Sequence, residues 1–174
     1  MRELENILTP FERLGLPRRF SIDDSELERK HLALSRGAHP DFHSNSTAEL
    51  RANAEAESAA INEAYATLKD PFRRAEALLK LLGGPDASQQ KEVPPALLME
   101  MLELREQIES ATDPAKAQIE SKLLEREATL IAEIRKTFAE CEHSSAPPAL
   151  LKGIRRDLNA AKYLRGLLRD LRNY

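Results

Sequence analysis

Apolar residues recur at intervals of three and four along most of this 174-residue chain, with proline and glycine at the interruptions. Side chains at this spacing share one face of an α-helix, so each run predicts a helix with one buried side. Aromatic residues make up only 5% of the chain and charged residues 32%, a composition typical of amphipathic helices. The fold class is therefore predicted as all-α.

The C-terminal half carries three such runs, separated by Asp113-Pro114 and by Pro147-Pro148. Their members are Leu97, Met101, Leu104 and Ile108; Ile119, Leu123, Leu130, Ile134, Phe138 and Cys141; and Ile154, Leu158, Ala161, Leu164, Leu168 and Leu171. Three amphipathic helices with short connections bury such faces against one another. We therefore predict a C-terminal three-helix bundle.

Two helices joined by a short loop are predicted in the N-terminal half. Asp23 and Ser46 are each followed three residues later by glutamate, a capping-box pattern that marks two helix starts. The first helix ends near Gly37, because Pro40 disfavours helical geometry at the residue before it. A shorter helix starts at Pro71, and we expect the two longer helices to lie antiparallel. The positions predicted to be buried on the two longer helices are Leu27, His31, Leu34, Ala38, Leu50, Ala54, Ile61, Ala64, Tyr65 and Leu68.

A polar stretch rich in proline and glycine separates the two halves of the chain. It has no apolar periodicity, which is typical of a boundary between modules. We predict an N-terminal domain over residues 5–83, a linker over residues 84–95 and the helical bundle over residues 96–173, in a two-lobed or L-shaped arrangement.

The net charge of −3 hides an uneven distribution. Residues 1–83 carry −2 (12 basic against 14 acidic side chains), residues 84–145 carry −6 (7 against 13) and residues 146–174 carry +5 (7 against 2). A nucleic-acid-binding module is usually basic throughout with interleaved aromatic residues, so we expect no nucleic-acid partner. We expect the basic last helix to be solvated or to pair with the acidic helices before it.

Cysteine content and apolar run length exclude further classes of protein. A single cysteine, Cys141, can form neither an internal disulfide nor a cysteine-based cluster site. No stretch has the apolar length of a signal peptide or a membrane span. We therefore expect a soluble, cytoplasmic protein with no membrane partner.

The triplet His39, Pro40 and Asp41 lies in the predicted loop between the two N-terminal helices. The helix before the triplet carries a basic face that is available to a partner. That face consists of Arg29, Lys30 and Arg36. In this context the triplet resembles the loop of a J-domain, the module through which co-chaperones engage the ATPase domain of a DnaK-type chaperone.

The resemblance continues beyond the J-domain. The stretches FERLGLPRRFSID (11–23), INEAYATLKDPFRRAEALLKLLG (61–83) and LLMEMLELREQIE (97–109) are similar to the corresponding parts of the HscB family, the J-domain co-chaperones of iron–sulfur cluster biogenesis. The match covers both predicted domains in order, and a short helical bundle follows the J-domain, as in that family.

The resemblance implies a co-chaperone with no enzyme activity of its own. Such a protein stimulates the ATPase of a DnaK-type, HscA-like chaperone and delivers the iron–sulfur scaffold protein IscU to it. The residues implied in chaperone binding are His39, Pro40, Asp41, Arg29, Lys30 and Arg36, and those implied in scaffold binding are Leu98, Met99, Leu102, Glu103, Glu106 and Tyr163. We expect a monomer without cofactor or metal.

The residues themselves support the second site independently. Leu98 and Leu102 form an apolar row beside the core stripe of their helix, and a surplus row is a candidate binding surface. The alternative is that these side chains are core, as most helical apolar stripes are.

Two other interpretations of the loop remain open. Ala38 and Phe42 stand where J-domains usually have an aromatic residue and a lysine, which would fit a helical interaction module with a degenerate J-like loop. His39, Asp41 and His43 alternate as metal ligands can, which would fit a metal-dependent hydrolase. The titratable residues predicted to serve packing alone are His31 and Cys141.

Overall fold

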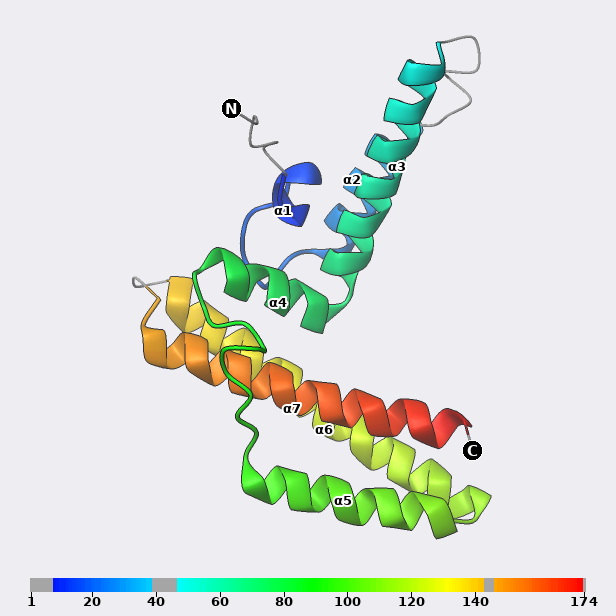
Figure 1. The fold of residues 1–174 in the computed structure, drawn as a ribbon, viewed down its shortest axis with the longest axis vertical. Helices are drawn as coiled ribbons and strands as arrows, with labels where there is room; N and C mark the ends of the chain where they lie inside the picture. Colours follow the sequence, from blue (N-terminus) through cyan, green and yellow to red (C-terminus); the bar gives the residue numbers. More distant parts are fainter. Residues whose placement is uncertain (1–7, 39–46, 143–145, 174) are drawn as a thin grey trace. The chain divides into compact units, whose positions relative to one another are not determined.

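The structure is a computed structural model that describes residues 8–38, 47–142 and 146–173. Every regular element within these ranges is an α-helix, and the helices run from α1 to α7 (Figure 1). The chain divides into two compact units, Met1–Leu78 and Leu79–Tyr174. The predicted all-α fold class is confirmed.

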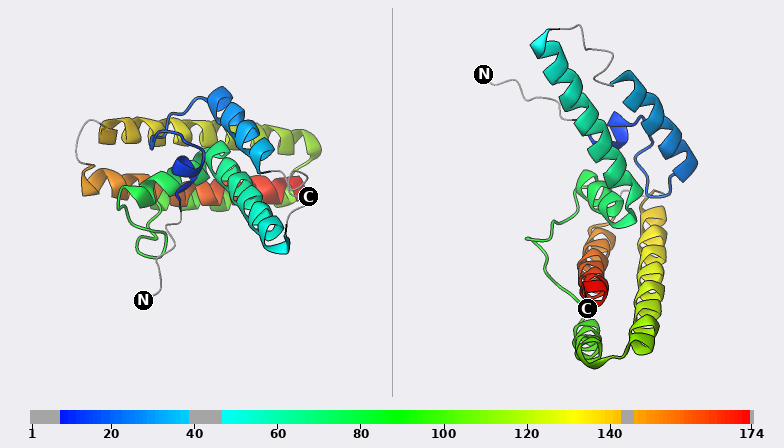
Figure 2. Two further views of the ribbon diagram at one scale, coloured as in Figure 1. Left: turned by 90° about the horizontal axis from the view of Figure 1, so that it is seen from above. Right: turned by 90° about the vertical axis from the view of Figure 1, so that its right-hand side faces the viewer.

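The first unit is built around a helical hairpin. Its arms are α2 (Asp24–Gly37) and α3 (Ala48–Lys69), which lie side by side and antiparallel (Figures 1 and 2). The short helix α1 (Pro10–Arg13) packs on α3, and α4 (Pro71–Leu81) follows α3 almost directly. The buried core of the unit includes Phe11, Leu14, Leu16, Phe20, Leu27, Ile61, Ala64 and Leu68.

Side-chain caps set the starts of both hairpin helices. Asp23, the predicted N-cap of α2, accepts hydrogen bonds from two backbone N–H groups at 2.8 and 3.4 Å. The cap of α3 is Thr47, whose Oγ1 accepts the N–H of Leu50 at 3.3 Å. The capping-box pattern at Ser46, which lies outside the described residues, thus placed this start one residue early, because Thr47 offers an equivalent hydroxyl one position later.

Two positions predicted to be buried on the hairpin, Leu34 and Leu50, are exposed. The buried side chains gather at the other end of the hairpin, formed by the start of α2 and the second half of α3, where α1 packs. Helical periodicity identifies the apolar face of a helix but not how far along the helix a third element covers it.

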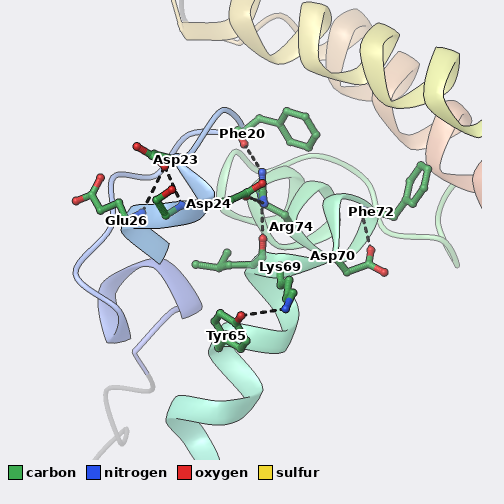
Figure 3. A network of polar contacts seen from close by, with 11 residues as sticks. Phe20, Asp23, Asp24, Glu26, Tyr65, Lys69, Asp70, Phe72 and Arg74 are labelled. Atoms are coloured by element: carbon green, nitrogen blue, oxygen red, sulfur yellow. Dashed lines mark hydrogen bonds and ion pairs between the residues drawn. The ribbon is translucent and has the colours of Figure 1, made fainter. Parts of the chain in front are cut away.

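A buried arginine holds four segments of the first unit together (Figure 3). Arg74 of α4 donates from Nε to the carbonyl of Leu68 at 2.6 Å and from a guanidinium nitrogen to the carbonyl of Phe20 at 3.1 Å. A second nitrogen lies 3.4 Å from Oδ1 of Asp24 at the start of α2. The guanidinium therefore joins α4, the end of α3, the segment before α2 and α2 itself.

The substitution Arg74→Leu tests this role. It keeps an apolar stem but removes the donors, so two carbonyls near the core each lose a hydrogen bond, and we expect the free energy of unfolding to fall by about 3 kcal/mol in urea titration. The neighbouring Arg73 is a matched control, because its ion pair with Glu63 is exposed. Arg73→Leu should cost less than about 1 kcal/mol, and equal losses for the two variants would contradict the account.

The second unit contains the predicted three-helix bundle. Its helices are α5 (Pro95–Ser110), α6 (Asp113–Glu142) and α7 (Pro148–Asn173), and α6 runs antiparallel to the other two (Figure 1). The closest pair is α6 and α7, and α5 packs against both. All predicted stripe residues of α6 and α7 are buried, as are Leu97, Met101 and Ile108 of α5, whereas Leu104 is half-buried.

The stretch predicted as a linker lies within the second unit and is fixed to α7. Its first turn follows Gly83, whose φ of 74° closes the end of α4. Further along, Asn159 of α7 donates from Nδ2 to the carbonyls of Gln90 at 2.9 Å and Glu92 at 3.0 Å. Gln90 in turn donates from Nε2 to the carbonyl of Lys152 at 3.1 Å. These bonds set where α5 begins relative to α7.

Candidate partner-binding surfaces

Helix α5 has apolar side chains on two adjacent rows, and only one row is buried. Leu97 and Met101 are each 5% exposed and point into the bundle, whereas Leu98 is 40% exposed and Leu102 61% exposed. Met99, at 65%, is more exposed still. The interpretation of these three side chains as core residues is therefore wrong, and α5 presents an apolar strip to solvent.

Tyr163 of α7 lies across a groove from this strip. The groove has a volume of about 440 Å³ and is lined by Leu98 and Leu102 on one side and by Tyr163 on the other. Because α5 and α7 run parallel, contacts between them repeat about every seven residues, which is two helical turns. Seven residues beyond Leu98 and Tyr163, a guanidinium nitrogen of Arg105 lies 3.2 Å from Oδ2 of Asp170. The structure thus brings together three of the side chains that the sequence analysis selected for a single site. Met99 is exposed beside the groove without lining it.

Opposite charges flank the groove. Glu103 and Glu106 are exposed on α5, on the same helical face as Met99. Lys162 and Arg169 line the groove from the α7 side and are exposed. The sequence analysis selected the two glutamates but treated the basic residues only as part of a charged helix, because which of them face a neighbouring helix depends on packing.

Part of the basic last helix is paired with α6, as expected. Arg172 of α7 lies 2.9 Å from Oε1 of Glu120, and Arg165 lies 3.6 Å from Oε1 of Glu127. These pairs offset part of the positive charge on α7 within the bundle, and they lie on a different face of α7 from the groove.

The basic face of α2 is only partly available to a partner. Arg29 and Arg36 are exposed, and Leu32 lies exposed between them on the same helical face. Lys30 is half-buried, and its ammonium donates to the carbonyl of Gly15 and lies 3.5 Å from Oε1 of Glu26. Lys30 therefore holds α2 against the segment that follows α1.

The loop triplet His39, Pro40 and Asp41 lies outside the described residues and follows Ala38, the C-cap of α2. The alternative metal set, which adds His43, lies outside them as well. Within the ranges that the structure describes, no group of three or more histidine, cysteine or acidic side chains is placed to hold a metal ion.

His31 and Cys141, the two titratable residues predicted to serve packing alone, both pack against neighbouring side chains. His31 shares a hydrogen bond of 2.9 Å between Nε2 and Oδ1 of Asn62 and stacks on Tyr65 with ring centroids 4.0 Å apart, which ties α2 to α3. Cys141 is buried, and burial raises the pKa of its thiol. Its burial on the apolar face of α6 makes Cys141 a core residue, as predicted.

Comparison with known proteins identifies the family. The co-chaperone protein HscB homolog of Vibrio cholerae serotype O1 is 38% identical over 148 residues, which span 82% of this chain and 86% of that protein. The chain belongs to the HscB co-chaperone family. The HscB homolog of Ralstonia nicotianae is 39% identical over 104 residues, 59% of either protein.

Solved HscB structures share the fold. The chaperone HscB from Vibrio cholerae superposes with a TM-score of 0.80 at 31% identity, over 95% of this chain and 96% of that one. Human co-chaperone protein HscB superposes with a TM-score of 0.84 over 97% and 83% of the two chains, and at 23% identity that likeness shows the fold alone. The HscB-family chain thus has a J-domain followed by a C-terminal three-helix bundle.

The C-terminal bundle also matches a family model of its own. The model described as the HSCB C-terminal oligomerisation domain covers residues 93–172, which contain α5, α6 and all but the last residue of α7. None of the helices in the described ranges is long and apolar enough to span a membrane.

The exposed row of α5 should contribute little to folding. For Leu98→Ala combined with Leu102→Ala, we expect the free energy of unfolding to fall by only about 1 kcal/mol, because Leu98 is 40% exposed and Leu102 61% exposed. Leu97→Ala and Met101→Ala are the matched buried controls, and each should cost about 3 kcal/mol. Urea titrations of these three variants measure the changes. A loss of about 3 kcal/mol in the double variant would show that Leu98 and Leu102 belong to the core.

Proposed function

We propose that this chain is an adaptor co-chaperone. It stimulates the ATPase of a DnaK-type, HscA-like chaperone through its J-domain and delivers the iron–sulfur scaffold protein IscU to that chaperone through its C-terminal bundle. The observation that carries the proposal is the exposed strip of Leu98 and Leu102 facing Tyr163 across a groove, in a chain of the HscB family.

The strip has the chemistry of a protein-binding site. Large apolar side chains exposed together are rare on a protein surface without a partner, and aromatic residues and methionine are common anchors of interfaces. Glu103 and Glu106 beside the strip would attract a basic region of the scaffold protein and fix its orientation. The scaffold protein carries the cluster as cargo, so the single buried cysteine of this chain is not needed as a ligand.

Docking on the chaperone is assigned to the face of α2 and the loop after it. Arg29 and Arg36 are exposed and free to approach an acidic surface, which speeds association by electrostatic steering. Pro40 restricts the backbone of the loop, and the Asp41 carboxylate can accept a charge-assisted hydrogen bond from a cation on the chaperone. The hydrolytic chemistry remains that of the chaperone, and this chain regulates it.

Two binding units on one chain raise the effective concentration of each partner for the other. A scaffold protein held by the bundle is presented to the chaperone at the moment when the J-domain promotes ATP hydrolysis. Hydrolysis then commits the chaperone to tight binding of the scaffold protein.

Two departures from the usual J-domain sequence favour a second candidate function. Most J-domains have an aromatic residue at the position of Ala38 and a lysine at the position of Phe42. With these departures the chain would instead be an interaction module that binds the scaffold protein without stimulating any chaperone. An ATPase assay with the purified chaperone separates the two functions, because only the co-chaperone accelerates hydrolysis.

Leu98→Ala combined with Leu102→Ala should weaken scaffold binding about a hundredfold in calorimetry, since two anchor side chains are lost. Stimulation of the chaperone ATPase in the absence of scaffold protein should stay unchanged. Leu124→Ala is the matched control, because Leu124 is an exposed leucine of α6 that does not line the groove. Equal binding by the double variant and the control would place the scaffold site elsewhere.

Asp41→Asn tests the J-domain. It keeps the size of the side chain and removes its charge, so we expect stimulation of the chaperone ATPase to be lost while the calorimetric affinity for the scaffold protein stays unchanged. Arg36→Ala should give a partial loss, and Arg51→Ala, an exposed arginine of α3, should give none. Full stimulation by Asp41→Asn would exclude the proposed role of the loop.

A further inference from the structure

The groove between α5 and α7 contains a glycine that the fold does not require. Gly166 lies in the interior of α7 and lines the groove together with Leu102 and Tyr163. It does not have positive φ, and a Cβ atom added to it would meet no neighbouring side chain or other segment within 4 Å. Glycine is unfavourable in a helix interior, so neither backbone geometry nor internal packing accounts for Gly166.

The open space above Gly166 has an apolar wall on the α5 side and charged side chains beside it on α7. Leu98 and Leu102 form the α5 wall, Tyr163 stands beside Gly166 on α7, and the buried Met101 and Leu167 lie at the base. At one end the ion pair between Arg105 and Asp170 limits the groove. The groove has a volume of about 440 Å³, and its apolar part, formed by Leu98, Leu102 and Tyr163, suits a large apolar side chain, which would leave water on entering it.

The charges on the two rims specify what should flank that side chain. Beyond the α5 wall lie Glu103 and Glu106, and beyond Tyr163 lie Lys162 and Arg169. A partner segment that crosses the groove therefore meets negative charge on one side and positive charge on the other. Complementary charges on the partner fix the direction in which the segment lies.

We propose that the groove receives a protruding apolar side chain of the scaffold protein, with Gly166 as its seat. A basic group of the scaffold protein next to that side chain faces α5, and an acidic group faces α7. This inference rests on the proposed function, which assigns the scaffold protein to this surface, and it adds the depth of the site, its contact residue on α7 and the charge pattern of the bound segment.

Gly166→Leu fills the seat without disturbing the fold, because leucine favours the helix and the added side chain enters open space. We expect the calorimetric Kd for the purified scaffold protein to rise at least about tenfold, as for loss of one buried apolar side chain, while the melting temperature does not fall. Gly166→Ala, which fills less of the space, should give a smaller rise of the same sign.

Gly153→Leu is the matched control. Gly153 is a second glycine of α7 with open space at its Cβ position, and it lines a different hollow, next to Gln90 and Lys152. This variant should bind the scaffold protein within about twofold of the unaltered chain. The inference is overturned if Gly166→Leu binds as tightly as the unaltered chain, or if Gly153→Leu loses as much affinity. Absence of binding by the unaltered chain would instead refute the proposed function and the inference together.

The charge pattern has its own test. Lys162→Glu should raise the Kd about fivefold at low ionic strength and less at high salt, because rim charges act over a screened distance. Lys152→Glu makes the same change on α7 outside the groove and should leave the Kd nearly unchanged. Equal effects of Lys162→Glu and Lys152→Glu would show that no acidic group of the scaffold protein faces Lys162.

Discussion

Helix α5 carries more apolar surface than its two neighbours can cover. Its packing against α6 and α7 buries Leu97, Met101 and Ile108, and this orientation leaves Leu98 and Leu102 on the side that faces outward. The row of Leu97 and the row of Leu98 lie about 100° apart around the helix axis. Turning α5 to bury the row of Leu98 would move the row of Leu97 toward water. The exposed strip is therefore a consequence of how the bundle is packed, and the groove beside Tyr163 follows from the parallel course of α5 and α7.

Different interactions stabilise the interior of each unit. The second unit depends on apolar stripes, supplemented by hydrogen bonds from Asn159 that fix the segment before α5. The first unit has a small core at one end of its hairpin, and the buried guanidinium of Arg74 connects the segments around that core. This arrangement leaves the face with Arg29 and Arg36 uninvolved in holding the fold, and so available to a partner.

Much of the fold could be predicted from the sequence, because helical periodicity and capping residues are local signals. The stripes of α6 and α7 and the cap at Asp23 were predicted correctly. Leu34 and Leu50 were not, because burial depends on which other segment covers a face. The role of Arg74 could not be predicted for a similar reason, since two of its three partners, Phe20 and Asp24, lie 54 and 50 residues away in the chain.

The candidate site was only partly predictable. Leu98 and Leu102 could be selected as a surplus row, but Tyr163 entered only through the family resemblance, because no local pattern places it opposite α5. Gly166 gave no signal in the sequence, where it is one of two glycines within a long helical run. Its meaning depends on the empty space above it, which exists only in the folded bundle.

Hydrogen–deuterium exchange of the full chain with and without the scaffold protein tests the central claim most directly. The account predicts slower exchange in α5 over residues 98–105 and in α7 over residues 162–170 when the scaffold protein is added. Exchange in the middle of α3 should not change. Protection confined to the J-domain, or absent from both sides of the groove, would contradict the assignment of the scaffold protein to the bundle.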